Sequence, residues 1–305
     1  IFSLNKLAIN AITSTQKENI LSILDGQSDK VEIALSRPLQ QVQAIAQEES
    51  VGEYTNGKNK QAAADKVMVL FRSIMIGSKY SNIYLMDTTG NVILSAAPRF
   101  LNNNFSFRDY FTRALEGGSH IQIAFGVLTQ KPGYYFSAPV YLGSDVVGVV
   151  VIKVEVGYIE SLFEESLINR VGHHFLTDEN GVIVTTSKDI ERYQSMGKIS
   201  EKKIAKITKE RRFDGFGVKP LQYQLVQDVI EDYRGQVAME YLDYSYDEGG
   251  EYERELLSVQ KIGDYPFYLV TESNLDTIFE QIYKTIWPIS LLLITSFAIG
   301  ISILS

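Results

Sequence analysis

The 305-residue chain contains no cysteine, and this absence excludes several kinds of chemistry. Without a thiol the chain has no cysteine nucleophile, no disulfide and no cysteine-based zinc site. Histidine is scarce as well, with only His120, His173 and His174. His173 and His174 are adjacent, so on a strand their side chains point to opposite faces and make a poor metal pair. We therefore expect no metal centre and structural roles for all three histidines.

Common catalytic and nucleotide-binding motifs are missing too. The sequence has no GxSxG, HExxH, Walker loop or GxGxxG, the patterns that present a nucleophile, a metal or a phosphate cradle. The acidic run at 243–255 (DYSYDEGGEYERE) lacks the aspartate spacing of an EF-hand, so we interpret it as a solvated loop. These absences predict that this region is not an enzyme and needs no cofactor.

The chain also lacks an excess of basic charge. Its 29 Lys and Arg residues against 37 Asp and Glu give a net charge of −8. A nucleic-acid binder needs a basic face, so we expect no nucleic-acid partner. The composition, 45% hydrophobic and 22% charged, is ordinary for a folded protein with a real core. The length predicts one or two domains.

Charged residues disappear near the end of the chain. Residues 286–304 (IWPISLLLITSFAIGISIL) include no Asp, Glu, Lys or Arg. At about 1.5 Å per residue this stretch is nearly long enough to cross a hydrocarbon core of about 30 Å. Lys284 and Trp287 stand where interfacial anchors belong. We predict a transmembrane helix at 282–305, with a buried globular helix as the alternative, and expect the chain to be a fragment of a longer membrane protein.

The start of the chain has the pattern of helices. Apolar residues at spacings of three, four and seven predict one long helix over 13–50. Gly26 weakens this helix and Pro38 is expected to kink it. A polar, Gly- and Asn-rich loop should follow from Gly52, and a second helix is predicted over 62–76. The long helix belongs to no sheet and could run alongside the rest of the chain.

Two similar hairpin patterns follow. Residues 82–96 (NIYLMDTTGNVILSA) and 174–187 (HFLTDENGVIVTTS) both consist of a strand, a D-x-x-G turn and a strand. In such turns the Asp side chain bonds back to the backbone and the Gly supplies a positive φ. The turn aspartates, Asp87 and Asp178, lie 91 positions apart. We interpret the two segments as parts of related sheet modules in tandem.

The first module is predicted at 62–157. After its hairpin come a short helix over 105–117 and three strands, at 121–128, 134–141 and 146–156. The last of these, with the sequence VVGVVVIKVEV, is the most β-prone segment of the chain.

The second module is predicted at 158–281. It ends in a strand pair at 256–262 and 265–272. With the helix and loop of 1–61 and the segment at 282–305, the fold class is α+β. We expect two antiparallel sheets of about five strands each, joined by a helix near 157–168.

Polar residues in the first module indicate a binding site. Lys153 interrupts an otherwise apolar strand, where an unpaired buried ammonium is costly. Arg108 lies in FSFRDYF and Thr129 in VLTQKPGYY. Arg offers a planar fork for a carboxylate, Lys a point charge and Thr a hydroxyl, so together they can hold an anion. Alternatively, Lys153 reaches solvent at a strand end or pairs with Glu155. The residues predicted to bind the ligand are Arg108, Tyr110, Thr129, Lys131, Tyr135, Ser137 and Lys153.

The order of these motifs resembles a known family. A hairpin, F-S-F-R-x-Y-F, G-x-x-T, P-G-Y-Y-x-S-x-P-V and G-V-V-V-x-K-V over 82–157 are similar to the double Cache (tandem PAS-like) sensor domain of bacterial membrane receptors. The closest likeness is to the periplasmic sensor of C4-dicarboxylate histidine kinases. The resemblance carries the ligand-binding arginine, threonine and lysine over to Arg108, Thr129 and Lys153. Phe105 stands where the family usually has tyrosine.

A rival branch of this superfamily binds amino acids. Its pattern contains Arg-x-Trp-Tyr-x-Asp and places an aspartate where this chain has Lys153, and the Trp and Asp features are absent at 108–113. An amino acid needs a carboxylate for its ammonium group, whereas two cations suit two carboxylates. The residues therefore favour a dicarboxylate or a similar small organic anion.

The resemblance implies the sensing part of a transmembrane signalling receptor at the cell membrane, with this domain periplasmic or extracellular. The membrane-distal module would bind the anion, and a homodimer would form through the N-terminal helix. A histidine kinase is the expected output, with a diguanylate cyclase or a chemotaxis receptor as alternatives. From another class of function, an extracytoplasmic interaction module without a small ligand also remains open.

Overall fold

The computed structural model contains two sheets and the helices around them. The described residues are 2–57, 60–164, 166, 168, 172–213, 217–245, 251–275, 280 and 284.

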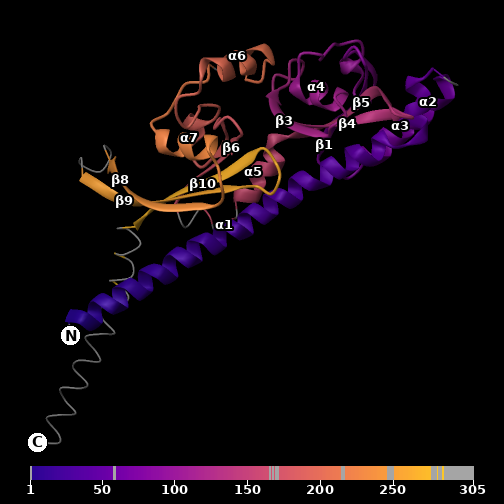
Figure 1. Ribbon diagram of the computed structural model, residues 1–305. Helices are drawn as coiled ribbons and strands as arrows, with labels where there is room; N and C mark the ends of the chain where they lie inside the picture. The colour runs from indigo at the N-terminus through magenta and orange to yellow at the C-terminus, as the bar shows by residue number, and fades with distance from the viewer. Residues whose placement is uncertain are drawn as a thin grey trace, which may run out of the picture.

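One helix, α1 (Phe2–Ala46), spans 45 residues and runs past both sheets (Figure 1). The prediction of a long bracing helix is confirmed, but its bounds at 13–50 were wrong at both ends. The helix includes the opening residues and continues through Pro38. It stops at Ala46 because the chain turns there and starts a new helix, α2 (Glu49–Thr55).

The loop predicted from Gly52 is partly helical. Gly52 is buried inside α2, together with Val51 and Tyr54. Tertiary burial of this short helix outweighs the weak helix propensity of glycine. The next helix, α3 (Lys60–Met75), agrees closely with its prediction at 62–76.

The first sheet has five antiparallel strands in the order β2-β1-β5-β4-β3. Their bounds are β1 (Tyr80–Asp87), β2 (Val92–Ser95), β3 (His120–Phe125), β4 (Pro132–Leu142) and β5 (Asp145–Glu155). A 3₁₀ turn, η1 (Pro98–Phe100), and a helix, α4 (Asp109–Leu115), connect β2 to β3. The helix predicted over 105–117 is shorter than expected, because Arg108 is extended (φ −84°, ψ 135°) and begins it as N-cap.

A helix, α5 (Val156–Glu164), follows directly from β5 and leads to the second sheet. This sheet has the order β7-β6-β10-β9-β8, the same topology as the first. Its strands are β6 (His173–Asp178), β7 (Ile183–Thr186), β8 (Val237–Ser245), β9 (Glu251–Lys261) and β10 (Phe267–Asn274). Between β7 and β8 lie η3 (Asp189–Glu191), α6 (Glu201–Lys209) and α7 (Gln224–Glu231). The prediction of two five-stranded antiparallel sheets joined by a helix is confirmed.

The acidic run at 243–255 was predicted as a loop, but its described residues, 243–245 and 251–255, lie in strands β8 and β9. Asp243 at the end of β8 pairs with Glu253 on β9, and Tyr244 pairs with Tyr252. Tyrosine favours β-strands, so the sequence of these positions is compatible with paired strands. The solvated-loop interpretation was therefore wrong for these positions.

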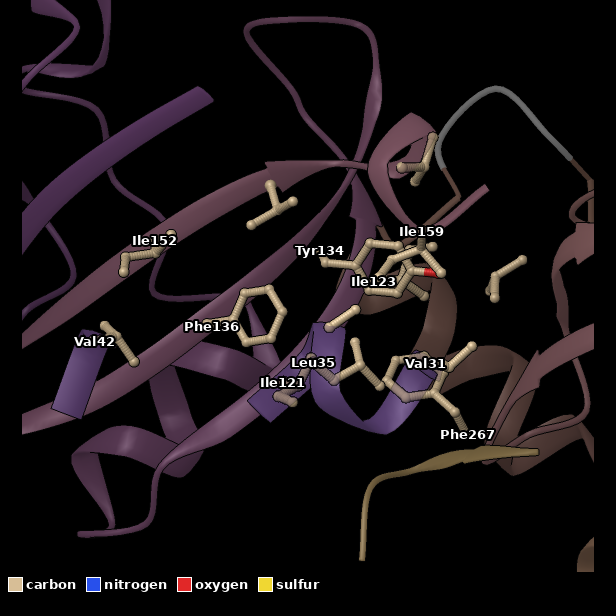
Figure 2. Packing of buried hydrophobic residues seen from close by; sticks show 14 of the residues in the cluster. Val31, Leu35, Val42, Ile121, Ile123, Tyr134, Phe136, Ile152, Ile159 and Phe267 are labelled. Atoms are coloured by element: carbon tan, nitrogen blue, oxygen red, sulfur yellow. The ribbon is translucent and has the colours of Figure 1, made fainter. Parts of the chain in front are cut away.

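The two faces of β5 lead to different surroundings. Val150, Ile152 and Val154 belong to the large core that α1 covers, whereas Val149 and Val151 belong to a separate aromatic cluster on the opposite face. Figure 2 shows the α1 side, where Leu35 and Val42 face Phe136 and Ile152 across a common core. Because side chains alternate along a strand, Lys153 lies on the aromatic face, away from α1.

The large core also joins the two modules. It includes α1 residues, the first sheet, Ile159 of α5 and Phe267 of β10 (Figure 2). The rings of Tyr134 and Phe267 meet edge to face with centroids 5.7 Å apart. The sheets themselves lie within the predicted modules at 62–157 and 158–281.

Within the described residues, no helix combines the length and the apolar character that crossing a membrane requires. The transmembrane helix predicted at 282–305 lies outside the described residues, apart from Lys284.

Candidate ligand-binding site

Lys153 is fully buried on the aromatic face of the first sheet. Its Nζ donates to Thr129 Oγ1 at 2.9 Å and lies 3.4 Å from Glu155 Oε1. Burial lowers the pKa of Lys153, the neighbouring Glu155 carboxylate opposes this, and the cations Arg99 and Lys131 lower the pKa further. Lys153 and Thr129, which were both predicted to belong to the site, are therefore in contact, and the pairing with Glu155 that was considered as an alternative is also present.

Two glycines leave room for these side chains. A Cβ on Gly133 would lie 2.5 Å from Lys153 Cε, so the lysine stem crosses β4 where no side chain blocks it. A Cβ on Gly126 would lie 2.2 Å from Thr129 Oγ1 and 2.9 Å from Tyr135 Oη. The glycines of the G-x-x-T and P-G-Y-Y segments thus bring the threonine, tyrosine and lysine close together.

Stacked tyrosines lie beneath this group. Lys153 Nζ lies 5.7 Å from the centre of the Tyr135 ring, at cation–π distance. Tyr135 stacks on Tyr110 with centroids 5.1 Å apart, and the Tyr110 and Tyr84 hydroxyls are 2.8 Å apart. Burial raises the pKa of Tyr110 to about 12, although the Arg108 guanidinium opposes the shift. These tyrosines are neutral hydrogen-bonding groups at physiological pH.

Arg108 is 2% exposed, and backbone carbonyls hold its guanidinium. Its Nη2 donates to Phe125 O at 2.6 Å, and its Nη1 donates to Glu210 O at 3.0 Å and Arg211 O at 2.9 Å. The charge lies close enough to Tyr110 and Tyr135 to lower the pKa of both hydroxyls against the effect of burial. Arg108 and Lys153 are therefore both close to Tyr135, but Arg108 is bonded to the second module.

The remaining predicted residues have different roles. Ser137 is buried and donates to Tyr110 O at 2.6 Å, so it positions α4 on the sheet. Lys131 is exposed, and its carbonyl accepts from Gly126 N at 2.9 Å. Its ammonium acts on Lys153 only through charge.

Sequence reasoning missed several residues around the site. Arg99 contributes a further positive charge near Lys153, and Gln122 accepts from Tyr110 N at 3.4 Å and donates to Glu210 Oε2 at 2.9 Å. The segment Glu210–Arg212 of the second module was also missed. No local signal connects it to Arg108, because about a hundred residues separate them and only the packing of the two modules brings them together.

A cleft of about 660 Å³ lies elsewhere, at the end of the first module near α2 and the β4–β5 turn. Its lining includes Glu48, Glu49 and Glu53 but none of the predicted site residues. An acidic lining disfavours an organic anion, so volume alone does not locate the anion site.

The three histidines have structural partners. His120 Nε2 lies 3.5 Å from Asp109 Oδ2, and His173 Nε2 lies 3.0 Å from Glu191 Oε2. His174 is buried and its ring stacks on Phe163 with centroids 5.1 Å apart. The described residues form no cluster of acidic and histidine side chains that could hold a metal ion.

Two like sheet modules, a bracing helix and a cationic cluster in one module define a two-module sensor fold. Residues 8–282 match the family model of the Cache domain, dCache_1. The chain therefore belongs to the Cache domain family, and the match includes both modules. The resemblance inferred from the motifs over 82–157 is confirmed.

Two curated relatives are C4-dicarboxylate transport sensor proteins named DctB. The protein from Rhizobium meliloti (strain 1021) is 25% identical over 167 residues, which are 53% of this chain and 26% of the relative. The protein from Pseudomonas aeruginosa (strain PAO1) is 29% identical over 146 residues, 47% of this chain and 23% of the relative. The matched part of the chain thus spans about a quarter of the length of these relatives.

Solved structures show the same fold. The sensor domain of the Vibrio cholerae histidine kinase DctB superposes with a TM-score of 0.67 at 18% identity, covering 87% of this chain and 98% of that domain. The sensory domain of the Campylobacter jejuni chemoreceptor Tlp3, with isoleucine bound, gives 0.58 at 12% identity, covering 88% and 96%. The chain is a double Cache sensor domain, close to the C4-dicarboxylate sensor kinases.

Proposed function

We propose that this domain senses a small organic dianion, such as a C4-dicarboxylate, in its first module. The main support for this proposal is Lys153, whose ammonium group is fully buried while the side chain of its carboxylate partner, Glu155, is 43% exposed. A partner in solvent compensates a buried charge poorly. A ligand carboxylate inside the site would replace it with a buried, charge-assisted hydrogen bond, while Thr129 keeps its own contact with Lys153.

The second carboxylate of the ligand would bind Arg108. The three carbonyl contacts are made by Nη1 and Nη2 of Arg108. A guanidinium has five N–H donors, so Arg108 has more donors than these three contacts require, and the Nε side of an arginine can hold a carboxylate in a bidentate pair. Tyr135, which is close to both cations, and Tyr110, which stacks on it, would supply an aromatic wall with hydroxyl groups. Two cations around one wall suit a ligand with two negative ends.

The wider role follows from the family. We infer that the domain is the sensing part of a transmembrane receptor, periplasmic or extracellular, with the segment at 282–305 crossing the membrane. The DctB relatives make a histidine kinase the first choice of output. The similar fold of a chemoreceptor domain makes a chemotaxis receptor the second choice of output. The similar fold of a domain from a GGDEF family protein makes a diguanylate cyclase the third. A homodimer through α1 would carry the signal.

Calorimetric titration and thermal unfolding with succinate test the ligand proposal. At 100 times its Kd, a ligand stabilises the folded state by about 2.7 kcal/mol. Succinate should do so for the wild-type protein, and isoleucine at the same concentration should not. K153M and R108M should each bind succinate at least about tenfold more weakly, a loss of roughly 1.4 kcal/mol.

R113M is a matched control, because Arg113 lies on α4, its side chain is 54% exposed, and among the described residues it forms an ion pair with Asp109 of its own helix. Equal succinate affinity in wild-type, K153M and R108M proteins would exclude the proposed site. Stabilisation by isoleucine in place of succinate would assign the domain to the amino-acid-binding branch.

A further inference from the structure

The second module holds the ligand-binding arginine of the first. Arg108 Nη1 donates to the carbonyls of Glu210 and Arg211, which follow the last helical residue of α6. The C-terminal end of a helix carries partial negative charge and free carbonyls, so a guanidinium there is stabilised. Arg108 is in effect a cap on a helix of the neighbouring module.

The turn that presents these carbonyls has a defined geometry. Arg211 N donates to Thr208 O and Arg212 N to Ile207 O, the pattern of a Schellman motif. Arg211 adopts φ +50°, the left-handed conformation that this motif requires. The backbone direction at 210–211 is therefore set by the end of α6, independently of Arg108.

The same segment is clamped to the edge strand β3 of the first module. Arg212 Nε donates to Ile123 O at 3.3 Å, and Phe125 N donates to Arg212 O at 2.7 Å. Gln122 Nε2 donates to Glu210 Oε2 at 2.9 Å. Arg212 is anchored within its own module by an ion pair of 2.8 Å with Asp178. The edge groups of β3 are thus satisfied by residues of the other module, which fixes the distance between α6 and Arg108.

We propose that the segment Glu210–Arg212 is a positioning element of the ligand site, which therefore spans both modules. Its carbonyls hold Nη1 of Arg108 and thereby orient the guanidinium toward a ligand carboxylate. This inference rests on the proposed function for the ligand. By linkage, a ligand on Arg108 must in turn strengthen the docking of the second module on the first. Occupancy of the first module is thereby transmitted to α6.

A ligand-independent test is hydrogen exchange in the segment 207–213. R108M should raise the exchange rates of these amides at least about fivefold, because the carbonyl cap is lost, and R113M should leave them unchanged. Unchanged exchange in folded R108M would overturn the proposal whether or not any ligand binds. In the wild-type protein, saturating succinate should slow exchange at 207–213.

The ligand test compares two variants of Arg211. Both lose the side chain, but proline has φ near −65° and cannot form the turn, whereas glycine adopts the left-handed conformation. R211P should bind succinate at least about fivefold more weakly than R211G. When each Arg211 variant is combined with R108K, their affinities for succinate should differ by less than about twofold, since lysine lacks the guanidinium fork.

The results separate the two proposals. Equal affinity of R211P and R211G for succinate would overturn the positioning role while leaving the ligand site intact. If wild-type protein binds no succinate, the proposed ligand fails, and the hydrogen-exchange comparison of R108M with R113M alone decides whether the modules are coupled through Arg108.

Discussion

The two modules have the same backbone fold and differ in their side chains. Asp87 Oδ1 accepts from the amides of Thr89 and Asn91, at 2.9 and 3.0 Å. Asp178 Oδ1 accepts from the equivalent amides, two and four residues later, at 2.9 Å each. Both turns end in a glycine of positive φ, Gly90 and Gly181. The D-x-x-G hairpin is therefore the same structure twice.

The correspondence continues beyond the turn. Asn102 and Tyr193, which lie 91 positions apart, have φ values of 61° and 65°. Their amides donate to the equivalent carbonyls of Val92 and Ile183. Even an unfavourable left-handed residue is thus repeated, because the path of the chain after β2 and β7 requires it.

The side chains give the modules different roles. Lys153 on β5 lies opposite Asn82 on β1, and the corresponding position on β10, opposite His173 on β6, is Glu272. Arg108 begins α4 as N-cap, whereas Tyr223 begins α7, the helix that packs on the second sheet as α4 packs on the first. At the position of Lys153 the second module therefore has an acidic residue. At the position of Arg108 it has a neutral N-cap residue. This difference supports the proposal of an anion site in the first module.

The two turn aspartates also differ in their surroundings. Asp87 lies at the surface, but Asp178 is fully buried and pairs with Arg212. Removing one partner of a buried pair typically costs 3 to 5 kcal/mol. We expect D178N to lower the free energy of unfolding by about 3 kcal/mol and D87N by less than about 1 kcal/mol, since asparagine keeps the turn bonds in both. Urea unfolding measures this, and equal losses would contradict the comparison.

A pH-dependent effect, which reaches a similar size only at acidic pH, should arise at His174, where the first module has Ile83. Burial lowers the pKa of His174 to about 4 from 6.5, and His173 adds to the shift. Below pH 6.5 the unfolded chain takes up a proton that the folded protein does not. This histidine should therefore destabilise the fold increasingly from pH 6.5 to pH 4, by up to about 3 kcal/mol.

The matched variant is H174I, which introduces isoleucine, the residue that the first module has at the equivalent position, Ile83. Unfolding measured at pH 7, 5.5 and 4.5 should show a weaker loss of stability in H174I than in the wild-type protein. Parallel pH profiles would mean that other groups account for the acid sensitivity.

Lys153 should have little effect on the empty domain, in contrast to its effect on binding. Replacing a buried charge with an apolar side chain of similar volume is often neutral or stabilising. We expect K153M without ligand to be unchanged in stability or more stable by about 1 kcal/mol. A loss of more than about 1 kcal/mol in chemical denaturation would show that Lys153 is a structural residue.

The smallest effect concerns how α4 and α6 end. Both ends form the same motif, but the left-handed residue is Gly117 after α4 (φ 98°) and Arg211 after α6 (φ 50°). A side chain in this conformation costs about 1 kcal/mol. R211G should therefore raise the free energy of unfolding by up to about 1 kcal/mol, and G117A should lower it by a similar amount. Opposite signs in differential scanning calorimetry would contradict this interpretation.

Much of the fold could be predicted from local patterns. Alternating apolar residues and the two D-x-x-G turns indicated both hairpins, and the lysine within the apolar run of VVGVVVIKVEV indicated a charge that needs a partner. The bounds of α1 and α2 and the acidic hairpin were missed. Their ends depend on burial against other elements, as at Gly52, or on pairing across strands, as at Tyr244 and Tyr252.

The sequence by itself determined two tandem modules and a lysine that needs a partner, because periodicity and unpaired charge are properties of neighbouring residues. Only the tertiary structure decided where Arg108 points. Its partners at Glu210 and Arg211 follow more than a hundred residues later, and their carbonyls are backbone groups that every residue possesses. No residue type marks such a contact in advance. It arises because the end of α6 and the edge of β3 meet when the two modules pack together.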